Sequence, residues 1–200
     1  MSLSIPENAR NPEGVEMPGF GEVSPYPVKM ITGVLYPDGG RWSWTVDALS
    51  SLWGPPEDVS GEFPFTATDY YADIAPVLFR RFLSFPGLRD GGDLRIWKMQ
   101  ACSVERASRT PRAVNIDPGY VNGARLVLAS TKDHAHRIYL GGGIFGEVTL
   151  RFRFRRWDSF DYTFPDFAAG TYDAFLSIVR ERWLLETGTR RMRHDRQVLG

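Results

Sequence analysis

Apolar and polar positions follow two periods along the chain, and together they predict a mixed α+β protein. Runs rich in β-branched and aromatic residues, bounded by glycine, proline and aspartate, predict strands. Apolar residues spaced by three and four predict helices that bury one face. The expected strands are 28–36, 59–71, 77–85, 114–120, 124–131, 136–140 and 144–157. The expected helices are 42–53, 93–108 and 171–187, the second with Asp93 as its N-cap.

These elements run in the order β-α-β-β-α-β and continue into a β-hairpin and a helix. This order matches a ferredoxin-like core with a C-terminal extension. The broader expectation is an α+β fold with helices on one face of a largely antiparallel sheet. A three-residue turn over 141–143 is expected to pair Leu140 with Ile144. In that register Arg137 lies opposite Glu147.

Composition divides the chain into three parts and excludes several classes of protein. Residues 1–27 are rich in proline, glycine and glutamate and predict a flexible acidic arm, whereas 188–200 predict a flexible basic tail. Residues 28–187 are expected to form a single globular α+β domain. Basic and acidic residues balance at 24 each, which argues against a bulk nucleic-acid binder. A single cysteine, no long apolar run and no apolar leader favour a cytoplasmic protein without a membrane span.

The segment 147–155 alternates polar and apolar residues, as a strand with two different faces does. Its apolar face is expected to hold Val148, Leu150, Phe152 and Phe154. Its polar face, extended by Arg137 from the neighbouring strand, is expected to hold Glu147, Thr149, Arg151, Arg153 and Arg155. Arginine forks suit phosphate or carboxylate, so this face is a candidate ligand surface. The alternative is a solvated outer sheet face with ordinary ion pairs.

The loop 130–137 concentrates ionisable side chains just after an apolar strand. In extended backbone His134 and His136 point the same way and could chelate a metal if Asp117, Asp133 or Glu147 supplied a third ligand. The alternative is one surface and one structural histidine. As an acid–base group His136 is favoured over His134, because it begins a strand.

Two further candidates lie at expected turns. Asp117 precedes Pro118-Gly119, which is expected to form a turn, so its carboxylate is placed to act as a base or metal ligand. The alternative is an Asx-turn in which it accepts local backbone N–H groups. Asp69 and Tyr70 lie in an aromatic segment that could wall a pocket, or pack in the core around a turn-capping aspartate.

The sequence resembles an uncharacterised prokaryotic domain-of-unknown-function family over most of residues 28–180. The residues that carry the resemblance are Asn115 to Tyr120, Ala129 to Asp133, His136 to Leu140, Gly143-Ile144, Glu147 to Leu150 and Thr163 to Phe167. No activity, cofactor or catalytic residue is assigned to that family, so the resemblance transfers no role. It favours one polar site over a His134/His136 metal pair, built from Asp117, Lys132, His136, Arg137 and Glu147.

Three functions remain open. The favoured one is an enzyme or small-molecule-binding domain for a nucleotide- or phosphate-bearing anion. In it Asp117, His136 and Glu147 are catalytic, a divalent metal is an option, and the ligand contacts are Lys132, Arg137, Thr149, Arg151, Asp69 and Tyr70. The second is an RNA or single-strand nucleic-acid binding module that uses the arginines of 151–156 together with those of the basic tail. The third is an interaction or scaffold protein. No P-loop, dinucleotide fingerprint or nucleophile elbow occurs in the chain.

Overall fold

The computed structural model describes residues 26–65, 74–108 and 113–189. Ten strands are assigned in these segments: β1 (Pro27–Tyr36), β2 (Asp58–Val59), β3 (Phe63–Phe65), β4 (Leu78–Ser84), β5 (Arg89–Asp90), β6 (Asn115–Val121), β7 (Arg125–Ser130), β8 (Ile138–Gly141), β9 (Ile144–Arg153) and β10 (Arg156–Ser159). The helices are α1 (Gly39–Trp53), α2 (Leu94–Ser108), α3 (Pro165–Ala168) and α4 (Asp173–Glu186), with a 3-10 turn, Gly91–Asp93, before α2. None of these helices is long and apolar enough to cross a membrane.

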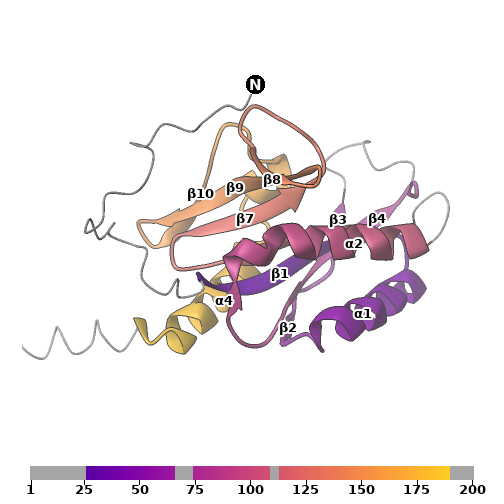
Figure 1. The fold of residues 1–200 in the computed structure, drawn as a ribbon, viewed down its shortest axis with the longest axis horizontal. Helices are drawn as coiled ribbons and strands as arrows, with labels where there is room; N and C mark the ends of the chain where they lie inside the picture. The colour runs from indigo at the N-terminus through magenta and orange to yellow at the C-terminus, as the bar shows by residue number, and fades with distance from the viewer. Residues whose placement is uncertain (1–25, 66–73, 109–112, 190–200) are drawn as a thin grey trace, which may run out of the picture.

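The strands form one antiparallel sheet in the order β10-β9-β7-β6-β1-β4-β2, and β3, β5 and β8 pair with β4, β1 and β9. The predicted α+β class with a largely antiparallel sheet is therefore confirmed. The strands up to β6 in the sequence supply the run β6-β1-β4-β2, and the strands β7, β9 and β10, which follow in the sequence, extend it on the β6 side (Figure 1).

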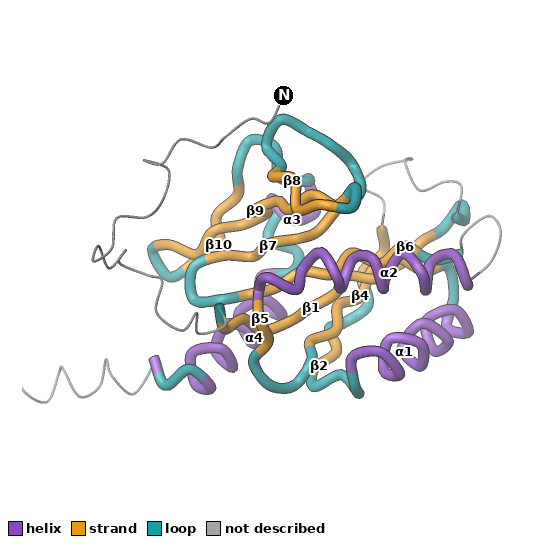
Figure 2. Tube along the Cα trace, viewed as in Figure 1, coloured by secondary structure: helices purple, strands orange, loops and turns teal. Residues whose placement is uncertain are grey.

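Helices cover both faces of the sheet, whereas the sequence predicted one helical face. Val34, Ile116 and their neighbours pack under α1 and α2 in one core. On the other face, Ile31, Leu126 and Leu150 pack under α3 and α4. Figure 2 shows α2 crossing in front of β1, with α1 and α4 at opposite ends of the view. The reason is that β1 is buried on both faces along almost its whole length, so each face needs a cover.

Capping explains where the first two helices begin. The Asp38 side chain accepts a hydrogen bond from the Arg41 N–H (2.9 Å) and starts α1. The predicted cap at Asp93 is wrong, because a 3-10 turn precedes α2. Asp90 caps that turn by accepting from the Gly92 N–H (2.9 Å). Both caps satisfy N–H groups that have no partner inside the helix.

The β8–β9 hairpin turns over two residues, Gly142 and Gly143, rather than the predicted three. Gly141 pairs with Ile144, and a bulge at Leu140 then restores the pairing of Ile138 with Gly146. This compensation is why Arg137 still lies opposite Glu147, as predicted, with 2.8 Å between Nε and Oε2. The turn glycines have φ of 62° and 75°, a conformation that side chains other than glycine rarely adopt.

A second bulge changes the faces of β9. Leu126 of β7 pairs with Leu150 but Val127 pairs with Val148, so Thr149 is an extra residue. The alternation therefore shifts by one at Thr149, and the predicted shared polar face is wrong. Glu147 and Thr149 belong to the α3–α4 face, whereas Arg151 and Arg153 belong to the α2 face.

The chain also turns where a continuous strand was predicted. β9 ends at Arg153 and β10 begins at Arg156, so Phe154 and Arg155 form a two-residue turn with φ of 49° and 63°. Each L-residue in this left-handed conformation costs about 1–2 kcal/mol, which is why Asn-Gly is common in such turns. Phe154 and Arg155 are turn residues that local preference would not select.

Two further strand predictions need correction. The expected strand 59–71 is interrupted: the structure assigns the short strands β2 and β3, and 66–73 lie outside the described residues. The turn expected at Pro118-Gly119 is instead the middle of β6. Proline fits there because β7 pairs with β6 only from Gly119 onward. A Cβ on Gly119 would lie 2.2 Å from the Val127 carbonyl oxygen, so that position requires glycine.

Candidate functional site

A cavity of about 340 Å³ opens on the α3–α4 face of the sheet. Residues of four strands form its floor: Arg80 lies on β4, Asp117 on β6, Leu128 on β7 and Glu147 on β9. The loop that follows β7 and the segment leading into α3 form its walls. The polar groups that line it are Arg80, Asp117, Ser130, Lys132, His134, Arg137, Glu147 and Thr149, and the apolar ones include Leu128, Phe164 and Phe167.

Arg80 is a buried cation of the cavity. Its guanidinium forms an ion pair with Asp166 of α3, and the same carboxylate accepts the Tyr172 hydroxyl at 2.7 Å. The guanidinium also lies over the Phe65 ring, 4.5 Å from its centroid. Burial acts to lower the pKa of Arg80, but Asp166, Tyr172 and Asp117 together outweigh it and the pKa is raised. Arg80 therefore remains charged in its buried position.

Asp117 is held by a lysine that reaches it from the other side of the sheet. Lys98 lies on α2, and its Nζ donates to the Ile116 carbonyl oxygen (2.6 Å) and to Asp117 Oδ1 (3.0 Å). It can do so because residues 115–118 of β6 have no partner from β7. Glu105 follows seven residues later on α2, and its Oε1 lies 3.7 Å from the same Nζ. Burial acts to raise the pKa of Asp117, but Lys98, Arg80 and Asn115 together outweigh it and the pKa is lowered.

Glu147 of β9 binds two residues at the end of the loop 130–137. Its Oε2 accepts from Arg137 Nε (2.8 Å) and lies 3.1 Å from His136 Nε2, while Thr149 Oγ1 donates to Oε1 (3.2 Å). The Arg137 Nη1 atom also donates to Ser130 Oγ (2.9 Å) and to the Lys132 carbonyl oxygen (3.0 Å). The loop 130–137 is thus fixed to the sheet by one arginine and one nearly buried carboxylate.

Flat groups form a parallel column beside this cavity. His134 and His136 stack with centroids 5.7 Å apart, and Tyr162 follows at 4.1 Å from His136. Phe160 continues the column 5.2 Å from Tyr162, and the Arg151 guanidinium lies 4.9 Å from the Phe160 centroid. The expectation that the two histidines point the same way fits this column, in which they stack.

A model of a protein family described as a domain of unknown function, DUF4416, matches residues 26–183. The chain belongs to this family. No curated protein and no solved structure matches the chain. The resemblance to an uncharacterised domain-of-unknown-function family is therefore confirmed. The particular signature residues and the prokaryotic origin stay predictions.

In this DUF4416 chain the cavity brings together five of the nine predicted site residues: Asp117, Lys132, Arg137, Glu147 and Thr149. His136 bonds Glu147 but lines a neighbouring cavity, and His134 takes its place here. Arg151 is on the other face of the sheet, where it pairs with Asp158 (2.7 Å), so its predicted placement beside Glu147 is wrong. Asp69 and Tyr70 lie outside the described residues.

Sequence reasoning missed Arg80, Lys98 and Glu105, and for two of them a signal exists. Lys98 and Glu105 are seven residues apart on the buried stripe of α2, which also holds Trp97, Ala101 and Val104. Residues seven apart lie on the same face of a helix, and opposite charges on an apolar face indicate a buried pair rather than a solvated one. No such signal exists for Arg80. Arg80 and Arg81 are adjacent on β4 and point to opposite faces, so the sequence does not show which of the two is buried.

The chemistry of Asp117 differs from both sequence interpretations. Its oxygens bind the Lys98 ammonium and the Asn115 amide (2.7 Å) rather than the backbone N–H groups of an Asx-turn. Its lowered pKa makes it a weak base, which favours a fixed negative charge over proton transfer. Within the described segments, no group of three or more His, Cys, Asp or Glu side chains could hold a metal ion.

Proposed function

We propose that the chain binds a small organic anion, a carboxylate or phosphate on an apolar or aromatic body, in the cavity on the α3–α4 face. The observation that carries this proposal is the lining of the cavity. Arg80, Lys132 and Arg137 line it against the two carboxylates Asp117 and Glu147. Arginine and lysine donors suit an anionic head, and the phenyl rings at its edge suit an apolar body.

The carboxylates do not cancel this preference. Lys98 from behind the sheet holds the pKa of Asp117 low and balances its charge. Glu147 is bonded by Arg137 and His136. In a site for a reaction rather than binding alone, the hydrogen-bonded Glu147–His136 pair is the proton carrier that we propose, because Asp117 is too weak a base. The strand order β6-β1-β4-β2 supports a ferredoxin-like core, and a cytoplasmic location remains part of this proposal.

A thermal-shift series on the full chain tests the proposal. Inorganic phosphate, citrate, phenyl phosphate and adenosine monophosphate are the probes, because they vary the head and the body separately. A probe at about one hundred times its Kd adds about 2.7 kcal/mol of stability. We expect phenyl phosphate or the nucleotide to raise the Tm more than inorganic phosphate does.

Lys132→Gln should diminish that shift, because Lys132 lines the cavity. Arg106→Gln, an exposed cation on α2 away from the cavity lining, is the matched control and should leave it unchanged. The proposal fails if no probe raises the Tm, or if the shift survives Lys132→Gln undiminished.

A further inference from the structure

The outer end of the β9–β10 hairpin carries a row of arginines on the α2 face, opposite to the face with the cavity. Arg125 pairs across the strands with Arg151, and Arg153 pairs with Arg156. Cross-strand partners share a face, and so do residues two apart on one strand. Arg125, Arg151, Arg153 and Arg156 therefore form one surface, here called the arginine strip.

The arginine strip breaks local rules of stability at several points. Like charges directly opposite each other destabilise a sheet, and this strip holds two such pairs. Asp158, 2.7 Å from both Arg151 and Arg153, is the one carboxylate within ion-pair distance of the strip among the described residues. The strained turn beside it exposes 82% of Phe154. Such violations concentrate at functional sites.

Planar groups and a second cavity continue from the strip. Arg151 covers Phe160, which begins the ring column through Tyr162 to His136. Arg125 also lines a cavity of about 350 Å³, together with Tyr120, Tyr162 and His136. One face thus offers a row of guanidinium groups, then rings, then an opening between aromatic walls.

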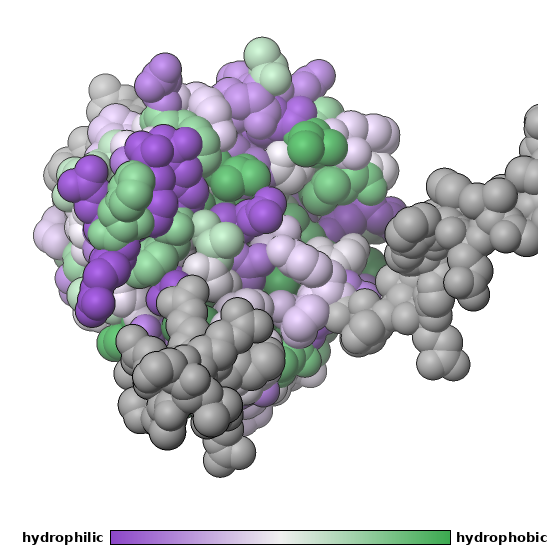
Figure 3. Space-filling model, turned by 90° about the vertical axis from the view of Figure 1, so that its left-hand side faces the viewer, coloured by the Kyte–Doolittle hydropathy of each residue, from purple (hydrophilic) through white to green (hydrophobic). Residues whose placement is uncertain are grey.

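We propose that this face binds single-stranded nucleic acid. Phosphates along a single strand would meet the arginine strip, Phe154 would stack on a base at the hairpin end, and one base would enter the cavity beside Arg125. Single strands fit better than duplexes because only unstacked bases can meet side-chain rings. Figure 3 looks at the side of the molecule where this hairpin lies, and strongly hydrophilic residues gather there beside apolar ones.

Fluorescence polarisation with labelled uridine and thymidine 20-mers tests the proposal on the full chain. Single-strand binding weakens with salt by a slope of about −0.7 per phosphate neutralised, so four arginines predict a slope near −3 in log K against log salt. Arg153→Gln with Arg156→Gln should bring the slope to about −1.4 and weaken binding roughly tenfold. The RNA and DNA probes separate the two sources of the same phosphate chemistry.

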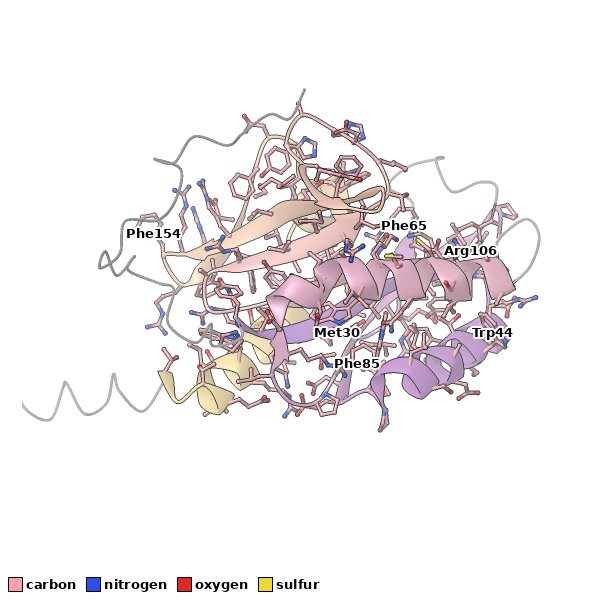
Figure 4. All side chains as sticks on the ribbon, viewed as in Figure 1. Met30, Trp44, Phe65, Phe85, Arg106 and Phe154 are labelled. Carbon is pink, nitrogen blue, oxygen red and sulfur yellow. The ribbon has the colours of Figure 1, made fainter. Side chains whose placement is uncertain are left out.

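Two controls separate the hairpin from other cations. Arg106→Gln removes one exposed charge at the far end of α2, well away from Phe154 in Figure 4, and should leave binding unchanged where Arg156→Gln weakens it. Phe154→Asn with Arg155→Gly relaxes the strained turn. It should raise the Tm and yet weaken binding, a combination that a folding defect cannot produce.

Several outcomes would overturn the proposal. Absence of binding to both 20-mers is one. Binding that the hairpin variants leave intact is another, since it would belong to the arginines of residues 190–200. A third is sedimentation with phosphatidylserine vesicles that depends on Phe154, without binding to either 20-mer, because the hairpin would then be a membrane contact.

Discussion

The cavity and the arginine strip are both rich in charge and share the strand β9, but they treat charge in opposite ways. In and around the cavity, cation pairs with carboxylate: Lys98 with Asp117, Arg137 with Glu147, and Arg80 with Asp166. On the strip, arginine lies opposite arginine, and the single carboxylate of Asp158 forms ion pairs with both Arg151 and Arg153. A buried charge must be balanced by an opposite charge inside the protein, whereas an excess of exposed positive charge is solvated and free to attract an anionic partner.

Removing the cation behind the cavity should have the largest effect on stability. Lys98→Met leaves Asp117 and Glu105 without their buried partner, so we expect the free energy of unfolding to fall by about 3–5 kcal/mol. Urea denaturation measures it. Arg106→Met removes an exposed cation from the same helix and should change stability by less than about 0.5 kcal/mol. Equal costs for the two variants would contradict the comparison.

Acid should lower the free energy of unfolding by less than Lys98→Met does, because Glu105 still balances Lys98 when Asp117 is protonated. Folding lowers the pKa of Asp117, so its stabilisation is complete above the ordinary carboxyl pKa of about 3.9 and is lost as the pH falls through the folded value. Asp117→Asn lacks this contribution at every pH. The stability gap between wild type and variant, followed by urea denaturation from neutral pH downward, should therefore narrow in acid. A gap that stays constant would show that Asp117 is not held by Lys98.

The strained turn should respond in the opposite direction. Phe154→Asn with Arg155→Gly suits the left-handed backbone, so the free energy of unfolding should rise by about 1–2 kcal/mol. Gly142→Ala places a side chain at the same conformation in the other hairpin and should cost about 1 kcal/mol. Thermal unfolding of both variants checks the pair. A loss of stability in the double variant would mean that Phe154 contributes packing.

Relieving one like-charge pair should give the smallest effect. Arg156→Gln removes the charge opposite Arg153, so a gain of about 0.2–1 kcal/mol is expected at low salt. Screening should erase most of the gain near 1 M salt, because the Debye length is then about 3 Å. A gain that does not depend on salt would point to backbone preference instead of repulsion.

Elements with a strong period could be predicted from the sequence, and so could one long-range contact. The helix predicted over 93–108 followed from apolar spacing, and the strands around Val34 and Ile116 followed from runs of β-branched and apolar residues. The Arg137–Glu147 contact followed from hairpin register, although the turn and the bulge at Leu140 were both unforeseen and compensated each other. Burial does not fix this register, because the side chains of β8 are exposed; the compensation returns Ile138 to the partner, Gly146, that the three-residue turn predicts.

What could not be predicted depends on irregular backbone and on distant strands. The bulge at Thr149 leaves no mark in the sequence, so Arg151 was placed beside Glu147 although it points to the other face. Arg80 joins the cavity only because β4 lies next to β1 and α3 folds back over that face. No local pattern specifies which of two adjacent arginines will be enclosed by elements more than eighty residues away.

The bulge at Thr149 has a consequence for how substitutions combine. The alternation of side chains between the two faces of the sheet shifts by one residue at the bulge. The parts of β9 before and after it therefore follow different patterns. Changes at Glu147 and at Arg153 should therefore add in their effects on stability, although only six positions separate them. By contrast, the effects on stability of changes at Glu147 and Thr149 should not add, because those two side chains are hydrogen-bonded to each other.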